Sequence, residues 1–169
     1  MAQRQPVVDS RLVVGGIYIM VFLRDTPENF HWALYHHLTE SSGTKYHIKG
    51  IGVAWIADHG TTSGVMRSMY LIGVMRIGYC APQDYLKVDT VVRSVPTDQA
   101  PPGYNSLTCR TWALHVVRLL GSGSNDYVRC NDIGALEQKV TKWGAENYDS
   151  AYVNEQPRPI ENSKVCQLD

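Results

Sequence analysis

The chain has 169 residues, of which 44% are hydrophobic and 19% are charged. This balance is typical of a globular protein and excludes an intrinsically disordered chain. Sixteen basic residues offset sixteen acidic ones, so the formal net charge is zero. Lys and Arg are also scattered, and we therefore expect no binding to nucleic acid or to an anionic membrane surface.

The apolar run of residues 12–23 is too short to span a bilayer as a helix, and no small-residue cleavage site follows it. Its Val, Ile and Tyr content is typical of a buried strand, and a signal anchor is the alternative. The four cysteines form no CxxC pair, and a chain of this size can be stable without disulfides. We therefore expect a reduced, cytoplasmic protein without stable membrane insertion.

Four segments in the first half of the chain have the composition of strands. They are rich in β-branched and aromatic residues, and turn residues separate them. A turn rich in Ser, Gly and Thr follows the second segment, as in a β-hairpin. The expected strands are residues 12–24, 30–38, 46–57 and 65–80, the last with a bulge at Gly73.

Three segments in the second half have helical patterns. Residues 84–95 form a short helix that a proline stops. Residues 106–120 carry an apolar stripe, with Ser106 or Asn105 as the N-cap. A further helix is expected over residues 132–147, where apolar residues recur at helical spacing.

These patterns predict an α+β fold. An antiparallel sheet of about four strands in the N-terminal half packs against about three helices in the C-terminal half. We expect one domain over residues 1–153. Residues 154–169 are polar and contain two prolines, which predicts an extended or loosely ordered tail.

Cys109 is the residue that points most directly to chemistry. It falls near the start of the helix expected over residues 106–120, where unpaired N–H groups and the helix dipole favour a thiolate. The same amides can bind a developing oxyanion. The alternative is a buried structural thiol, because Cys109 shares its helix face with Ala113, Val116 and Leu120.

His31 opens the second expected strand and is the candidate general base for this thiol. His47, on the next strand, is the candidate that orients the base. A turn centred on residues 41–43 would place residues 52–54 opposite His31, well over ~10 Å from His47. Asp58 is therefore the alternative orienting residue.

The remaining cysteines and histidines do not predict a metal site. Adjacent histidines on a strand point to opposite faces, so His36 and His37 cannot easily chelate one ion. His59 stands alone in a loop. Cys80, Cys130 and Cys166 lack a helix-start context, and we expect them to be structural thiols.

The order of these parts resembles the circularly permuted papain-like enzymes, which include the lecithin:retinol acyltransferase-like and NlpC-like families. In those families an H-W-[AG]-[IL]-Y strand supplies the base, a histidine on the next strand orients it, and an N-C-E-H-F-type helix start supplies the thiol. The HWALY sequence of residues 31–35 matches the first motif, and residues 105–112 match the last in layout. The resemblance covers residues 12–120.

The resemblance implies a cysteine-dependent acyl-transfer enzyme with Cys109, His31 and His47 in catalysis and no cofactor. It would act as a hydrolase or acyltransferase on an amide, ester or thioester of a small soluble substrate. Tyr104, Asn105 and Trp32 are the candidate substrate-binding residues, with loop, capping and core roles as their alternatives. Three other functions stay open: a non-catalytic member of the fold that binds a small molecule or a protein, a pathway-specific cyclase or condensing enzyme, and an interaction protein with exposed aromatic residues.

Overall fold

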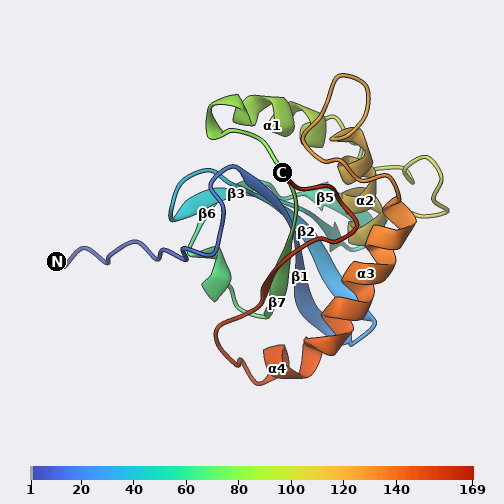
Figure 1. Cartoon of the computed structure of the whole chain (residues 1–169). Helices are drawn as coiled ribbons and strands as arrows, with labels where there is room; N and C mark the ends of the chain where they lie inside the picture. Colours follow the sequence, from blue (N-terminus) through green and yellow to red (C-terminus); the bar gives the residue numbers. More distant parts are fainter. Residues whose placement is uncertain (1) are drawn as a thin grey trace.

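The computed structural model describes residues 2–169 (Figure 1). Its centre is a six-stranded mixed sheet in which every neighbouring pair is antiparallel except the last. In spatial order the strands are β6 (Gly60–Ser63), β3 (Ser42–Tyr46), β2 (Asn29–His37), β1 (Gly16–Thr26), β7 (Leu71–Tyr79) and β8 (Ile160–Asn162).

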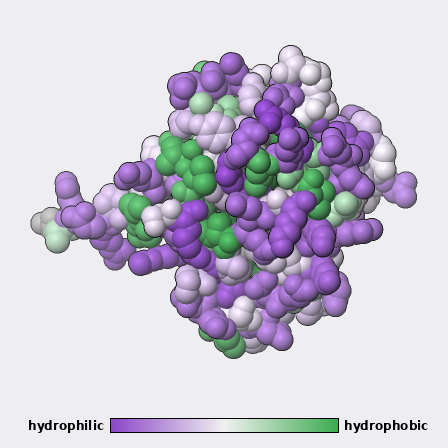
Figure 2. Space-filling view, viewed as in Figure 1, coloured by the Kyte–Doolittle hydropathy of each residue, from purple (hydrophilic) through white to green (hydrophobic). Residues whose placement is uncertain are grey.

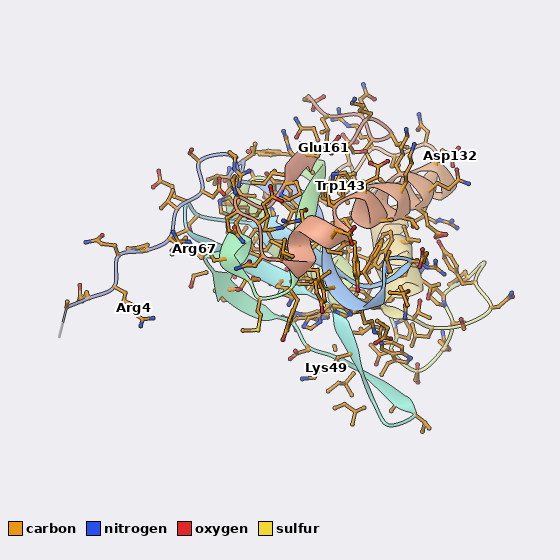
Figure 3. All side chains as sticks on the ribbon, turned by 90° about the horizontal axis from the view of Figure 1, so that it is seen from below. Arg4, Lys49, Arg67, Asp132, Trp143 and Glu161 are labelled. Carbon is orange, nitrogen blue, oxygen red and sulfur yellow. The ribbon has the colours of Figure 1, made fainter. Side chains whose placement is uncertain are left out.

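Helices cover one face of this sheet, since all four of them contribute side chains to the larger of two buried clusters. Two short strands, β4 (Ile48–Ile51) and β5 (Ala54–Ala57), form a separate ribbon that projects from the body, with Lys49 on it (Figure 3). The helices are α1 (Tyr85–Arg93), α2 (Cys109–Leu119), α3 (Ile133–Glu146) and α4 (Tyr148–Tyr152), with short 3-10 turns η1 (Val65–Arg67) and η2 (Pro82–Asp84).

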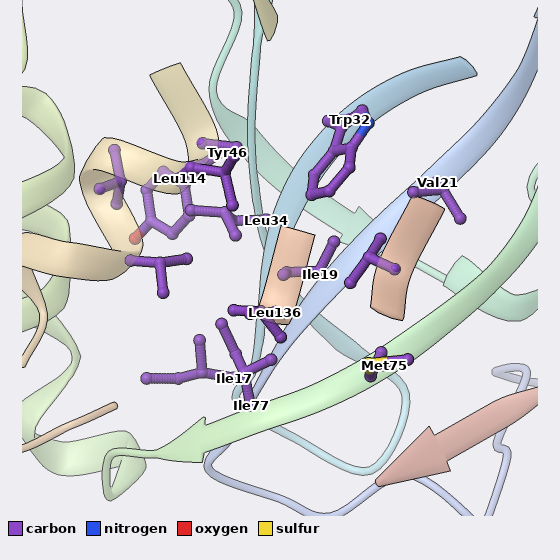
Figure 4. Close-up of a cluster of buried hydrophobic side chains, with 14 of the residues drawn as sticks. Ile17, Ile19, Val21, Trp32, Leu34, Tyr46, Met75, Ile77, Leu114 and Leu136 are labelled. Atoms are coloured by element: carbon purple, nitrogen blue, oxygen red, sulfur yellow. The ribbon is translucent and has the colours of Figure 1, made fainter. Parts of the chain in front are cut away.

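Strand alternation divides the buried side chains between the two faces. On β2, Trp32 and Leu34 belong to the cluster on the helix-covered face, whereas Ala33 and Tyr35 belong to a smaller cluster on the other face. Both faces of the central strands are therefore buried, which explains why β1 reads as a continuous apolar run. The larger cluster includes Ile17, Ile19, Val21, Trp32, Leu34, Tyr46, Met75, Ile77, Leu114 and Leu136 (Figure 4).

The α+β class is confirmed, but the prediction of about four strands is wrong. The third expected strand, residues 46–57, is divided: β3 ends at Tyr46, and a turn at Gly52 (φ 61°) folds the rest into the β4–β5 ribbon. The fourth, residues 65–80, starts as the η1 turn, and the chain reverses at Tyr70 (φ 66°) before β7 begins.

Helices α1 and α3 lie within the predicted ranges, whereas α2 begins later than predicted. Its N-cap is Thr108, not Ser106 or Asn105. The Thr108 hydroxyl accepts the Thr111 backbone N–H at 3.1 Å, and the Thr111 hydroxyl accepts the Thr108 N–H at 2.9 Å. This reciprocal capping box makes Cys109 the first residue of the helix.

Of the two alternatives predicted for the segment after residue 154, extended or loosely ordered, the structure shows the first. Strand β8 pairs with β7 in parallel, and the Arg158 side chain is only 3% exposed. Its guanidinium donates to the Ile72 carbonyl through Nε (3.1 Å) and Nη2 (2.9 Å), and to the Glu155 carbonyl at 2.8 Å. These contacts fix a polar segment that has little apolar pattern of its own.

The surface in Figure 2 shows small groups of hydrophobic residues separated by hydrophilic ones. This face therefore presents no single continuous apolar area. Among residues 2–169, no helix has both the length and the apolar character needed to cross a bilayer.

Candidate active site

The N-terminus of α2 lies at one end of the sheet, where β1 and β3 finish and β2 begins. At this end Arg24 Nη1 of β1 is 3.9 Å from Cys109 Sγ. At the opposite end of α2, Leu120 accepts backbone hydrogen bonds from the segment that bridges to Gly78 of β7. The direction of α2 therefore brings Cys109 to the end of the sheet that also carries His31.

His31 and His47 lie in contact. His31 Nε2 is 3.0 Å from His47 Nδ1, and His47 Nε2 is 3.1 Å from Asp58 Oδ2. The three side chains thus form one chain of polar contacts in the order Asp58, His47, His31. Asp58 therefore contacts His47 and not His31.

The register of β2 and β3 explains the contact and corrects the predicted separation. Leu34 pairs with Tyr46, and β3 already begins at Ser42, so the turn is shorter and earlier than expected. Continuing this register places position 49 opposite His31, with His47 two residues away on the same face. Diagonal neighbours of this kind are within reach of long and aromatic side chains.

The hydrogen-bonding partners assign the tautomers. The Asp58 carboxylate can only accept, so neutral His47 donates from Nε2 and accepts at Nδ1. His31 must then donate from Nε2, which leaves the lone pair on its Nδ1. Among the described residues this Nδ1 has no hydrogen-bond partner, so it is the atom able to accept a proton.

Burial and nearby cations keep both histidines neutral. Burial is the largest cause that lowers the pKa of His31, to about 4, followed by the charges of His47, Lys45 and Arg24. Burial and Lys45 also lower the pKa of His47, and the Asp58 carboxylate opposes them. At neutral pH the pair therefore carries no positive charge.

Cys109 lies in a different environment from the two histidines. It is 3% exposed and belongs to the cluster on the helix-covered face. His31 alternates to the other face, where its ring lies 6.1 Å from that of Phe22. In residues 2–169, the hydrogen-bond contact of the Cys109 sulfur is with Arg24, and none joins it to His31 or His47.

The three predicted substrate-binding residues have different surroundings. Trp32 is 2% exposed and packs beside Phe30 in the core, so its side chain does not reach the surface. Tyr104 is half-buried against the larger cluster, whereas Asn105 is exposed in the loop before α2. Only Tyr104 and Asn105 are therefore open to a bound molecule.

A family model described as "Family of unknown function (DUF6540)" matches residues 17–123. The match covers more than half of the chain. The chain belongs to this family. A search of curated proteins and a search of solved structures each found no match.

The residues matched to DUF6540 contain Cys109, His31, His47 and Asp58, so the whole candidate site lies inside the family's range. The match ends shortly after α2. Helix α3, helix α4 and β8 are outside it, although they complete the fold of this chain.

Two residues of this candidate site in the DUF6540 chain were missed by the sequence patterns. Arg24 contacts the Cys109 sulfur, and His59 accepts the backbone N–H of His47 at 3.1 Å while its ring stacks on Trp112. Arg24 comes just after an apolar run, and His59 lies in a loop, so neither has a periodic signal. Only the pairing of the strands brings them to the site.

The adjacent histidines of β2 are buried, and each makes one hydrogen bond within the fold. His36 contacts the Cys80 carbonyl through Nε2 at 2.8 Å, and His37 Nδ1 is 2.8 Å from the Tyr35 hydroxyl. Both side chains are 1% exposed. Residues 2–169 include no group of three or more His, Cys, Asp or Glu side chains arranged to hold a metal ion.

Proposed function

We propose that this chain is a cysteine-dependent acyl-transfer enzyme of the permuted papain-like type, with Cys109 as nucleophile and His31 as base. It acts as a hydrolase or acyltransferase on an amide, ester or thioester of a small soluble substrate. The observation that carries the proposal is the Asp58–His47–His31 chain of contacts at the end of the sheet where α2 begins with Cys109.

In this mechanism His31 Nδ1 takes the proton of the Cys109 thiol, and the sulfur attacks the substrate carbonyl. His47, held by Asp58, keeps His31 in the tautomer that leaves Nδ1 free. As the first residue of α2, Cys109 has a backbone N–H without an intrahelical partner, which can donate to the oxyanion.

The proton then passes from His31 to the leaving group, and an acyl-enzyme forms on Cys109. Water or an acceptor amine or alcohol attacks this acyl group, with His31 again accepting the proton. The Arg24 guanidinium, 3.9 Å from the sulfur, stabilises the thiolate before it attacks and again when deacylation releases it, after which His31 returns the proton to the sulfur.

The mechanism requires two movements from the described conformation. Arg24 must leave space for the carbonyl, because Cys109 is 3% exposed. The His31 ring must also turn from Phe22 toward the edge of the sheet to reach the sulfur. Arg24 is exposed near the end of β1, so its side chain is free to rotate toward solvent.

Site-resolved alkylation tests the proposal. Folded protein is treated with iodoacetamide at pH 6.5, and labelling of each cysteine is followed by peptide mass spectrometry. We expect Cys109 to react about 10-fold faster than Cys80, in keeping with an activated thiolate. The experiment uses a Cys130→Ser background, because contact with Cys166 lowers the pKa of Cys130 to about 7 and makes it a competing nucleophile.

Two variants make the test specific. His31→Gln should slow labelling of Cys109 to the rate of Cys80, whereas His115→Gln on the body of α2 should leave it unchanged. If Cys109 in the Cys130→Ser background reacts no faster than Cys80 and Cys166, the nucleophile proposal fails.

A second candidate is a binding protein of the same fold without covalent chemistry. The burial of Cys109 and its contact with Arg24 rather than His31 favour it. For this candidate, Cys109→Ala should bind ligand as well as the native protein, and Cys109 alkylation should show no dependence on His31.

A further inference from the structure

A cavity of about 560 Å³ lies where the end of β1, the turn before β7 and helix α4 come together. Its volume is in the range of sites that hold small molecules, roughly 300–1,000 Å³. The residues that line it are Leu23, Arg24, Arg67, Ser68, Met69, Tyr70, Tyr148, Ala151, Tyr152 and Asn154.

The lining carries two positive charges and no carboxylate. Arg24 and Arg67 contribute the guanidinium groups, and Arg67 lies at the end of η1 (Figure 3). Neither makes an ion pair within residues 2–169. Two unpaired guanidinium groups beside one cavity favour an anion, since each can bind a carboxylate or phosphate through paired N–H groups.

The rest of the lining is aromatic and apolar. Tyr70, Tyr148 and Tyr152 supply three rings, and Tyr70 and Tyr152 are 63% and 75% exposed. Tyr70 also has a left-handed backbone (φ 66°), which is unfavourable for a side chain of this size. Such strain clusters at binding and active sites, and here it falls on a residue that lines the cavity.

Arg24 connects the cavity to the candidate active site. Arg24 lines the cavity, and its Nη1 lies 3.9 Å from the Cys109 sulfur. A molecule held by the anion-binding end of the cavity would therefore lie next to the thiol, and its charge would draw Arg24 away from the sulfur.

We propose that this cavity binds an anionic amphipathic small molecule, with its carboxylate, sulfonate or phosphate at Arg24 and Arg67 and its apolar body against the tyrosines. That this molecule is the acyl substrate of Cys109 rests on the function proposed above.

Binding of an anion in this cavity is tested with 8-anilinonaphthalene-1-sulfonate, an anionic aromatic probe, by fluorescence titration of the native protein. Saturable binding is expected, weakened about 10-fold in Arg67→Gln and unchanged in Arg118→Gln, a matched change of an exposed arginine on α2. Tyr152→Ala should also weaken binding, whereas Tyr85→Ala on α1 should not. The neutral analogue N-phenyl-1-naphthylamine should show no difference between the two arginine variants.

Absence of saturable binding, or equal losses in Arg67→Gln and Arg118→Gln, would overturn the binding site. The link to Cys109 is tested separately by adding the probe during alkylation. Protection of Cys109 but not of Cys80 is expected. If the probe binds in both native protein and Cys109→Ala but gives no protection, the cavity is a ligand site and the substrate assignment is wrong.

Discussion

His31 is a residue whose burial has a measurable thermodynamic consequence. In the folded chain its pKa is about 4, against 6.5 for the free side chain, with burial as the main cause. The unfolded chain therefore binds more protons than the folded chain between these two pH values. Since stability rises with pH wherever the unfolded state binds more protons, His31 contributes stability above pH 6.5 that is lost as the pH falls toward 4.

We expect the free energy of unfolding to depend less on pH in His31→Asn than in the native protein between pH 7.5 and pH 4.5. The free energy of unfolding of the native protein should fall between pH 7.5 and pH 4.5, and the His31 share of that fall is about 2 kcal/mol after allowing for partial exposure. Urea unfolding at the two pH values gives the change in unfolding free energy with pH for each protein. The difference between these two changes is the His31 contribution. An equal fall in both proteins would show that His31 is not held neutral by the fold.

The start of α2 shows how an element positions a reactive residue. Thr108 and Thr111 satisfy two backbone donors of the first turn reciprocally, and the Thr111 hydroxyl also donates to the Ser106 carbonyl at 2.9 Å. These bonds fix the direction in which the chain enters the helix. The cap therefore also fixes the position of Cys109, which follows Thr108 as the first residue of α2.

Removing the cap should therefore affect stability and reactivity together. Thr108→Ala is expected to lower the free energy of unfolding by about 1 kcal/mol and to change the alkylation rate of Cys109. Thr108→Ser keeps the hydroxyl and should behave as the native protein in both measurements. A stability loss of the same size in Thr108→Ser would mean that the methyl group, not the cap, is responsible.

The segments around Arg129 and Gln167 bring the thiols of Cys130 and Cys166 together. Arg129 and Gln167 form an antiparallel bridge, so Cys130 and Cys166 occupy the next directly opposed positions. Opposed residues at such a position have Cα atoms about 4.5 Å apart, within the range that a disulfide spans. Contact with Cys166 is also the main cause that lowers the pKa of Cys130.

We expect hydrogen peroxide to oxidise this pair to a disulfide. Cys130 would form a sulfenic acid, the Cys166 thiol would displace water from it, and the two thiols together would reduce one peroxide. Non-reducing peptide mass spectrometry should detect the Cys130–Cys166 crosslink in native protein and no crosslink in Cys166→Ser. A crosslink of either residue with Cys80 instead would contradict the pairing.

Over the whole molecule, the sequence patterns predicted the parts that have strong local signals. The apolar strand β1, the HWALY strand and the stripes of α2 and α3 were correct because burial imposes a period on their side chains. The contact of Arg24 with Cys109 was missed because it joins distant segments. The α2 cap and the β2–β3 turn are local, but Ser, Thr and Asn recur before α2 and in the turn, so the sequence offered several equivalent positions for each. His31 and His47 were predicted together, but the contact that joins them comes from a register that the turn sequence did not specify.

The C-terminal segment is the clearest case of structure without a local pattern, and its role can be tested by truncation. Strand β8 covers the β7 edge, the Val74 N–H donates to the Pro159 carbonyl at 3.1 Å, and Arg158 binds backbone carbonyls of β7 and of the segment around α4.

A chain that ends at Val153 should therefore lose more stability than Arg158→Met. The single substitution should cost about 3 kcal/mol, because it leaves buried carbonyls without a donor. Truncation removes these donors and also exposes the β7 edge. Arg118→Met, at an exposed position, is the control and should change stability by less than about 0.5 kcal/mol. If the truncated chain unfolds in urea at the same midpoint as the full chain, residues 154–169 are a dispensable tail after all.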